Sequence, residues 1–216
     1  MRPLSITECQ TRMDSGEVSC LIDLRSPADF AEGHVPGAIA LSAGDAGASW
    51  PVEVLPAEGR LLLLGDPASV HRFLEGVDVG LRERLEAFVE GGMAAWADAG
   101  RPVDMLVTIA ADELAMDLPH DDRILLLDVR PEAAFDEGHV RDAVSLPLAS
   151  LTDPGSMALF EDDSNIYLYG RDAAEAVTAA SLIKRQGYHN LRALEDGWER
   201  IRGQSGIRME RSASLN

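Results

Sequence analysis

The sequence predicts an α/β fold built from two copies of one domain, each a parallel β-sheet flanked by helices. Three observations carry this prediction. Residues 21–41 align without a gap to residues 126–146, and eleven of the 21 positions are identical at an offset of 105. Short apolar segments alternate with helical ones in both halves, as in a parallel sheet covered on both faces. The 216 residues suit two small domains, and the apolar content of 46% is enough for packed cores.

Each copy is expected to open with a helix and a buried strand. In the first copy, ITECQTRMDSGE reads as a short helix that ends at Gly16, and SCLIDL reads as the strand. In the second copy, we expect a strand at 105–110, a helix at 111–118 and a buried strand at 124–129. Both copies continue with Phe–x–Glu–Gly–His–Val, where the glycine permits the turn that ends a helix. A short strand follows, AIAL in one copy and AVSL in the other.

The next strand of each copy, Leu61–Leu64 or Ile166–Tyr169, runs directly into a loop and a helix. Backbone N–H groups converge at a helix N-terminus, which makes such a junction a ready anion site. In open α/β sheets the loops at the carboxyl ends of strands carry the chemistry. The candidate binding residues are therefore those of the two loops: Gly65, Asp66, Ala68 and Ser69 in the first copy, and Gly170, Arg171, Asp172, Ala173, Ala174 and Glu175 in the second.

The expected domains are residues 1–104 and 105–208, followed by a polar C-terminal tail at 209–216. The boundary is placed at AGRPVD because glycine and proline interrupt regular structure there. The closing segments of the two copies differ in sequence. Each contains a tryptophan, Trp96 or Trp198, which we expect to pack in a closing helix.

Composition restricts the partners. The net charge of −18 and a pI near 4.5 argue against nucleic acid and anionic membranes, which are polyanions. The same charge favours a protein partner with a basic surface. No apolar run is long enough to span a bilayer, and no signal peptide is visible, so a cytoplasmic protein is expected.

Asp23 with Arg25, and Asp128 with Arg130, follow buried strands in the two copies. Each pair could serve as a catalytic acid and an anion clamp. A charge-assisted pair at a strand end more commonly fastens the strand to its loop. We therefore favour the structural role.

Two histidines and two cysteines are further candidates. His34 and His139 could act as general bases, but a turn-fixing hydrogen bond is favoured because both follow a glycine in the repeated motif. Cys20 is expected to be a buried core thiol, and Cys9 could be exposed and redox-reactive. Two cysteines are too few for a disulfide framework and form no zinc pattern. No metal site and no cofactor are predicted.

These motifs resemble the rhodanese family over nearly the full length of both copies. The resemblance implies an α/β fold and, where the active-site cysteine is kept, sulfurtransferase chemistry. In that chemistry a thiolate at the start of the loop attacks a donor such as thiosulfate and becomes a persulfide, held by the loop amides. The residues that carry the resemblance are Asp23, Arg25, Phe30, Gly33, His34, Pro36, Gly37, Ala38 and Ile39, with the closing GGMAAW and AGRPV, and then Asp128, Arg130, Phe135, Gly138, His139, Ala143, Gly197 and Trp198.

The resemblance places Gly65 and Gly170 at the two positions of that cysteine. Glycine has no side chain that could attack a donor or carry sulfur, so no catalytic residue is assigned. The loops are also unsuited to an anion. Pro67 removes an amide donor beside Asp66, and the second loop has Asp172 and Glu175 against Arg171.

The leading hypothesis is a catalytically inactive rhodanese-like protein that acts as a binding or regulatory module for a basic protein surface or a small anion. The first alternative is a sulfurtransferase of the thiosulfate or 3-mercaptopyruvate type. It would need Cys9, Cys20 or a partner to supply the thiol. The second alternative is a structural scaffold or dimerisation unit.

Overall fold

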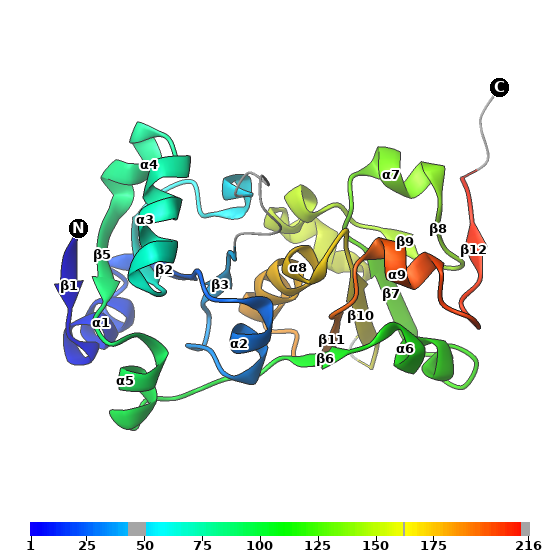
Figure 1. Cartoon of the computed structure of the whole chain (residues 1–216), viewed down its shortest axis with the longest axis horizontal. Helices are drawn as coiled ribbons and strands as arrows, with labels where there is room; N and C mark the ends of the chain where they lie inside the picture. The colour runs from blue at the N-terminus through cyan, green and yellow to red at the C-terminus, as the bar shows by residue number, and fades with distance from the viewer. Residues whose placement is uncertain (43–50, 162, 213–216) are drawn as a thin grey trace. The chain divides into compact units, whose positions relative to one another are not determined.

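A computed structural model describes the chain except for residues 43–50, 162 and 213–216. The chain divides into two compact units, Met1–Met105 and a second that begins at Leu106, and these correspond to the two copies. Each unit is an α/β domain in which helices flank a parallel sheet (Figure 1). The predicted fold class is confirmed.

The first unit contains a five-stranded sheet in the order β1-β5-β4-β2-β3, with every neighbouring pair parallel. The sequence patterns did not predict β1, because its three residues are too few to show a period. The unit comprises β1 (Arg2–Leu4), α1 (Ile6–Asp14), β2 (Val18–Asp23), α2 (Pro27–Glu32), β3 (Ile39–Ala40), the 3₁₀ turn η1 (Val52–Val54), β4 (Arg60–Leu64), α3 (Pro67–Gly76), α4 (Val79–Arg84), β5 (Leu85–Val89) and α5 (Gly92–Asp98).

The second unit contains a matching sheet in the order β6-β11-β10-β7-β9, again parallel throughout. A two-stranded antiparallel pair, β8 with β12, is added to it. The unit comprises β6 (Val107–Ile109), α6 (Ala111–Asp117), β7 (Ile124–Asp128), α7 (Glu132–Glu137), β8 (His139–Val140), β9 (Val144–Ser145), η2 (Leu148–Thr152), η3 (Pro154–Leu159), β10 (Asn165–Tyr169), α8 (Ala173–Arg185), β11 (Leu191–Leu194), α9 (Trp198–Arg202) and β12 (Met209–Glu210).

The strands β4 and β10 lie at the centre of their sheets because their residues are apolar on both faces. Leu61–Leu64 are completely buried, and Ile166–Tyr169 are at most 3% exposed. In the first sheet β3 lies on one side of β2, and the next strand along the chain, β4, lies on the other side. In the second sheet β9 and β10 flank β7 in the same way. Such a switch point opens a crevice at the carboxyl ends of the strands. The two candidate loops lie at these positions.

The segment 209–216 was expected to be a polar tail, and this expectation is wrong for its first residues. Met209 and Glu210 form β12 and pair with β8. The Glu210 carboxylate accepts a hydrogen bond from the backbone N–H of Asp142 and lies 3.3 Å from Nε2 of His139, and these contacts hold the strand against the unit. Residues 213–216 lie outside the described residues. In the described part of the chain, no helix combines the length and the apolar character needed to cross a membrane.

Candidate functional site

The second loop connects β10 to α8 through Gly170, Arg171 and Asp172. Asp172 is the N-cap of α8, and its Oδ1 accepts a hydrogen bond of 2.9 Å from the backbone N–H of Glu175. Gly197 packs against this loop, and a Cβ at Gly197 would lie 2.3 Å from the carbonyl oxygen of Arg171. Only glycine permits this approach, which positions the following residue, Trp198, beside the loop.

Glu175 fills the interior of the second loop. Its side chain is only 7% exposed, and Oε2 accepts a 2.7 Å hydrogen bond from the backbone N–H of Arg171. The Arg171 guanidinium donates to the same carboxylate through Nε at 3.2 Å. Burial raises the pKa of Glu175 above its usual range. The chain's own carboxylate therefore occupies the position where the sequence predicted an external anion.

The side chain of Glu175 also occupies the space next to Gly170. A Cβ at Gly170 would lie 2.8 Å from both Cβ and Oε2 of Glu175. Contacts under 3.0 Å with a Cβ fixed on a helix cannot be relieved by rotating a flexible side-chain end. Residue 170 therefore has no room for a cysteine side chain while Glu175 lies where it does.

The first loop is one residue shorter than the second. Asp66 follows Gly65 and is already the N-cap of α3, whose first residue is Pro67. The Asp66 carboxylate accepts hydrogen bonds from the backbone N–H groups of Ala68 (2.8 Å) and Ser69 (3.0 Å) and from the Ser69 hydroxyl (2.6 Å). The hydrogen bonds from Ser69 lower the pKa of Asp66, so the carboxylate is ionised. In this copy too, a carboxylate of the chain takes the amide donors.

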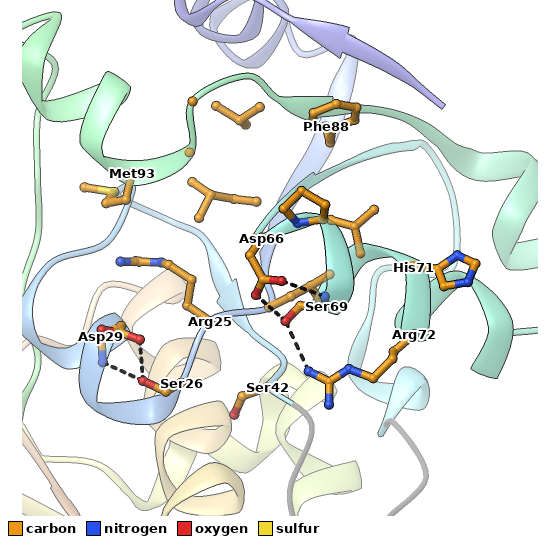
Figure 2. A pocket seen from close by; sticks show the side chains of 18 of the residues that line it. Arg25, Ser26, Asp29, Ser42, Asp66, Ser69, His71, Arg72, Phe88 and Met93 are labelled. Atoms are coloured by element: carbon orange, nitrogen blue, oxygen red, sulfur yellow. Dashed lines mark hydrogen bonds between the residues drawn. The ribbon is translucent and has the colours of Figure 1, made fainter.

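A pocket of about 1180 Å³ opens onto the first loop (Figure 2). It lies at the carboxyl edge of the sheet, where the segments that follow β2, β4 and β5 meet. Gly65, Asp66 and Ser69 form part of its lining, as do Arg25 and Met93. The second unit has a hollow of about 1430 Å³ whose lining includes Arg171 and Trp198, but among the described residues neither Gly170 nor Glu175 contributes to it. The pocket of the first unit therefore reaches the loop glycine, whereas the hollow of the second unit does not include Gly170 in its lining.

Both aspartate–arginine pairs have the structural role that the sequence favoured. Arg130 donates to Asp128 through Nε and Nη2, with a shortest distance of 2.6 Å, and to the carbonyl oxygen of Gly138 at 2.8 Å. Arg25 repeats these contacts with Asp23 and with the Gly33 carbonyl. Each pair ties the end of a strand to the turn that follows the next helix.

The two histidines also fix turns. The Nδ1–H of His139 donates to the carbonyl oxygen of Phe135 at 2.8 Å, and the two rings stack at 3.6 Å. His34 makes the same contacts with Phe30. Each histidine thereby fixes the turn that follows its helix, as the sequence favoured.

A second contact of the histidines was not predicted from the sequence. In each unit a segment that follows the last helix pairs with the histidine and places a carboxylate near its Nε2. Asp104 lies 3.7 Å from His34 in the first unit, and Glu210 lies 3.3 Å from His139 in the second. Sequence spacing gives no signal for this contact, because the paired residues are about 70 positions apart.

Both cysteines lie buried in the core of the first unit, and neither forms a disulfide. Cys9 is completely buried, and burial raises its pKa to about 11. Cys20 is 4% exposed and pairs in register with Leu61, four residues before Gly65 along β4. That spacing is roughly 13 Å along a strand. Neither thiol lies at a loop.

The fold and the two loops define a duplicated α/β protein in which a strand-to-helix loop at the carboxyl edge of each parallel sheet marks the place for binding or chemistry. The family model described as "Rhodanese-like domain" matches residues 5–99 and 110–204. The chain belongs to this family and contains two rhodanese-like domains in tandem.

Among curated proteins, a "Sulfurtransferase" from Allochromatium vinosum is 28% identical over 93 residues, which are 43% of this chain and 85% of that protein. The Centrosomal protein of 41 kDa from Gallus gallus is 36% identical over 95 residues, which are 40% of this chain. The matched part is 26% of that centrosomal protein. The relatives thus include both a protein of about one domain's length and a much longer one.

Among solved structures, a rhodanese-like domain from Anabaena sp. is 26% identical with a TM-score of 0.45, and the match covers 50% of this chain and 80% of that one. Thiosulfate sulfurtransferase from Pseudomonas aeruginosa is 17% identical with a TM-score of 0.42. That match covers 99% of this chain and 44% of the other.

Proposed function

We propose that this chain is a tandem rhodanese-like protein without sulfurtransferase activity that acts as a binding or regulatory module. The observation that carries the proposal is the state of the two loops. Both begin with glycine, and in both a carboxylate of the chain occupies the amide donors. These loops supply neither a nucleophile nor an empty anion cradle.

The chemistry of sulfur transfer explains why this matters. A thiolate must attack the sulfur donor and hold the transferred sulfur as a persulfide. Gly65 and Gly170 have no atom for this step. An anionic donor would also meet Asp66 in one loop and the buried Glu175 in the other, on a protein of net charge −18. Both the missing nucleophile and the negative charge that a donor would meet therefore oppose turnover.

The runner-up is a sulfurtransferase that uses a thiol from elsewhere, as the relative named "Sulfurtransferase" suggests. Cys9 and Cys20 are poor candidates. Both are buried, and the raised pKa of Cys9 keeps it protonated near neutral pH. A thiol supplied by a partner would still have to displace a bound carboxylate from either loop.

Thiosulfate:cyanide sulfur transfer by the wild-type chain and by the Cys9→Ala/Cys20→Ala double variant tests the proposal. We expect both proteins to show no turnover above buffer, with a cysteine-containing rhodanese as the positive control. Substantial turnover that disappears in the double variant would overturn the inactive assignment and support the runner-up.

The scaffold alternative is favoured for the second unit by the filled loop around Glu175, whereas the pocket at Gly65 favours binding in the first unit. We propose a cytoplasmic location as well, supported by two cysteines that form no disulfide. The acidic surface supports a protein partner over nucleic acid.

Crystals grown with sulfate test whether either loop binds an anion. We expect no sulfate at the second loop, because the Glu175 carboxylate occupies it.

A further inference from the structure

The pocket of the first unit has one apolar and one polar half (Figure 2). Leu74, Phe88 and Met93 contribute to the apolar half, and each is only partly buried. The polar half includes Arg25 and Ser42. A ligand that fits this pocket must therefore combine an apolar body with a polar edge.

The charges that line the pocket cancel. Arg25, Arg72 and the α-amine of Met1 carry three positive charges, and Asp29, Asp66 and the Asp23 carboxylate that pairs with Arg25 carry three negative ones. The remaining titratable side chain is His71, whose Nε2 lies 3.4 Å from Glu75. A cationic ligand would approach two arginines, and an anionic ligand would approach two aspartates. An uncharged ligand avoids both penalties.

Two donors in the polar half have hydrogen-bonding capacity left. Ser42 is 8% exposed, lines the pocket, and makes no hydrogen bond to another described residue. Arg25 uses Nε and Nη2 on Asp23 and Gly33, whereas its Nη1 has no partner among the described residues. The Arg25 side chain is 19% exposed, so an acceptor on a ligand can reach its Nη1 as well as the Ser42 hydroxyl. The acceptor that suits both is a neutral oxygen such as a carbonyl.

In the second unit an aromatic ring covers the corresponding arginine, although Arg130 and Trp198 still line a hollow there. Arg130, the counterpart of Arg25, lies under the ring of Trp198 with 3.7 Å from its Cζ to the ring centroid, and 5.7 Å from the ring of Tyr169. At the offset of 105, Met93 takes the place of Trp198 in the first unit, and Leu64 takes that of Tyr169. Smaller side chains therefore replace both rings, so no ring covers Arg25 from these two positions.

We propose that this pocket binds an uncharged apolar side chain of a partner protein's segment, with a backbone carbonyl of that segment accepting from Ser42 and Arg25. This inference rests on the proposed function, since it names what the binding module binds. A protein segment is the assigned source because it places an apolar side chain and neutral carbonyls next to each other, as the two halves of the pocket require.

Three matched probes test the assignment on the full chain at about pH 6, where an α-amine is protonated. They are N-acetyl-leucinamide (neutral), N-acetyl-leucine (anionic) and leucinamide (cationic). Shifts of backbone amide NMR signals report binding at Ser69, Phe88 and Met93, and Trp198 reports on the second unit. We expect the neutral probe to bind at least about threefold more tightly than either charged probe, with no shift at Trp198. A charged probe that binds as well, equal shifts in both units, or no shift at all would overturn the proposal.

Two variants and a longer probe sharpen the test. Met93→Trp should place a ring over Arg25, as Trp198 lies over Arg130, and should therefore weaken binding of the neutral probe. Ser42→Ala removes one donor with little change of volume and should weaken the neutral probe about threefold to tenfold. If the ligand is a protein segment, N-acetyl-Ala-Leu-Ala-amide should bind more tightly than N-acetyl-leucinamide. Unchanged affinity in Ser42→Ala, or no gain from the longer probe, would contradict the assigned contacts or the assigned source.

Failure of this inference is distinguishable from failure of the proposed function. Probe binding is read from NMR shifts and does not depend on turnover. Sulfur transfer in the cyanide assay would overturn inactivity and leave the probe result standing. Absent shifts would remove the pocket's assignment and leave inactivity standing.

Discussion

The Oε2 atom of Glu175 lies 2.8 Å from the position that a Cβ would take on residue 170. The same oxygen accepts the backbone N–H of Arg171 at 2.7 Å. One side chain thus fills the space of the missing nucleophile and satisfies the amide that would hold a transferred sulfur. Restoring a cysteine at residue 170 is therefore not enough to restore a reactive loop.

Gly170→Cys should destabilise the second unit, because its Cβ would overlap the Cβ of Glu175. Overpacking of this kind costs about 1–3 kcal/mol. The Gly170→Cys/Glu175→Gly double variant removes that Cβ, so it should recover part of the loss despite the cost of a helical glycine, about 1 kcal/mol, and should be the only one of the two that is sulfurated in excess thiosulfate. Thermal denaturation and intact mass measure the two effects.

Gly65→Cys is the matched control in the first unit. Its Cβ would lie 3.1 Å from Cβ of Leu24 and 3.7 Å from Cβ of Ser69, so a shift of a few tenths of an ångström accommodates it. It should cost less stability than Gly170→Cys. Equal costs at the two positions would show that Glu175 does not fill the second loop.

Glu175→Gln should change the pH dependence of stability. Burial raises the folded-state pKa of Glu175, so its contribution is most favourable when it is protonated and is lost as pH rises through that raised pKa. The variant has no such group. Its stability relative to the wild type should therefore increase from about pH 4 to pH 8, as measured by urea denaturation. A difference that stays constant over this range, or that reverses in sign, would contradict the buried carboxylate.

Asp142→Gly should stabilise the second unit by up to about 1 kcal/mol. Asp142 has φ of 64°, a left-handed conformation that costs an L-residue free energy, and the equivalent Gly37 has φ of 75°. The Gly37→Asp exchange should destabilise the first unit by a similar amount. Thermal denaturation measures the stability change of each variant. The two changes must have opposite signs.

Glu210→Ala should loosen β12. The change removes the acceptor of the backbone N–H of Asp142 (3.2 Å) and the carboxylate contact with Nε2 of His139 (3.3 Å). A loss of about 1 kcal/mol corresponds to roughly fivefold faster hydrogen exchange at Asp142. Asp104→Ala, the corresponding change in the first unit, should leave that amide unaffected. An unchanged exchange rate in Glu210→Ala would mean that the carboxylate does not hold the strand.

Cys9 and Cys20 should not react with a thiol reagent such as Ellman's reagent in the native protein at about pH 8. Cys9 is completely buried with a pKa raised to about 11, and Cys20 is 4% exposed. Both should react at once in denaturant. Rapid labelling of one thiol before unfolding would reopen a redox role for that cysteine.

Much of the fold was predictable because the relevant signals are local or repeated. The motif that contains Asp23, Arg25 and His34 recurs at a fixed offset, and duplication shows that its spacing is structural. The prediction of a structural role for these side chains holds, since the arginines and histidines bind backbone carbonyls in both units.

The candidate sites were predicted only as positions along the chain. The loop residues are correctly placed at strand-to-helix junctions, but the role of Glu175 could not be read from the sequence. Whether its carboxylate turns into the loop or out to solvent depends on the packing of α8 against β10. Whether Ser42 and Phe88 line the first pocket likewise depends on how separate strands pack side by side at one edge of the sheet.

The sequence by itself determined the duplication, the α/β class and the glycine at the start of each loop, because these follow from residue identity and spacing. Only the tertiary structure decided that Glu175 fills one loop, that Asp66 caps the other, and that a pocket opens at Gly65. The physical reason is that burial and hydrogen bonding are set by neighbours distant in sequence.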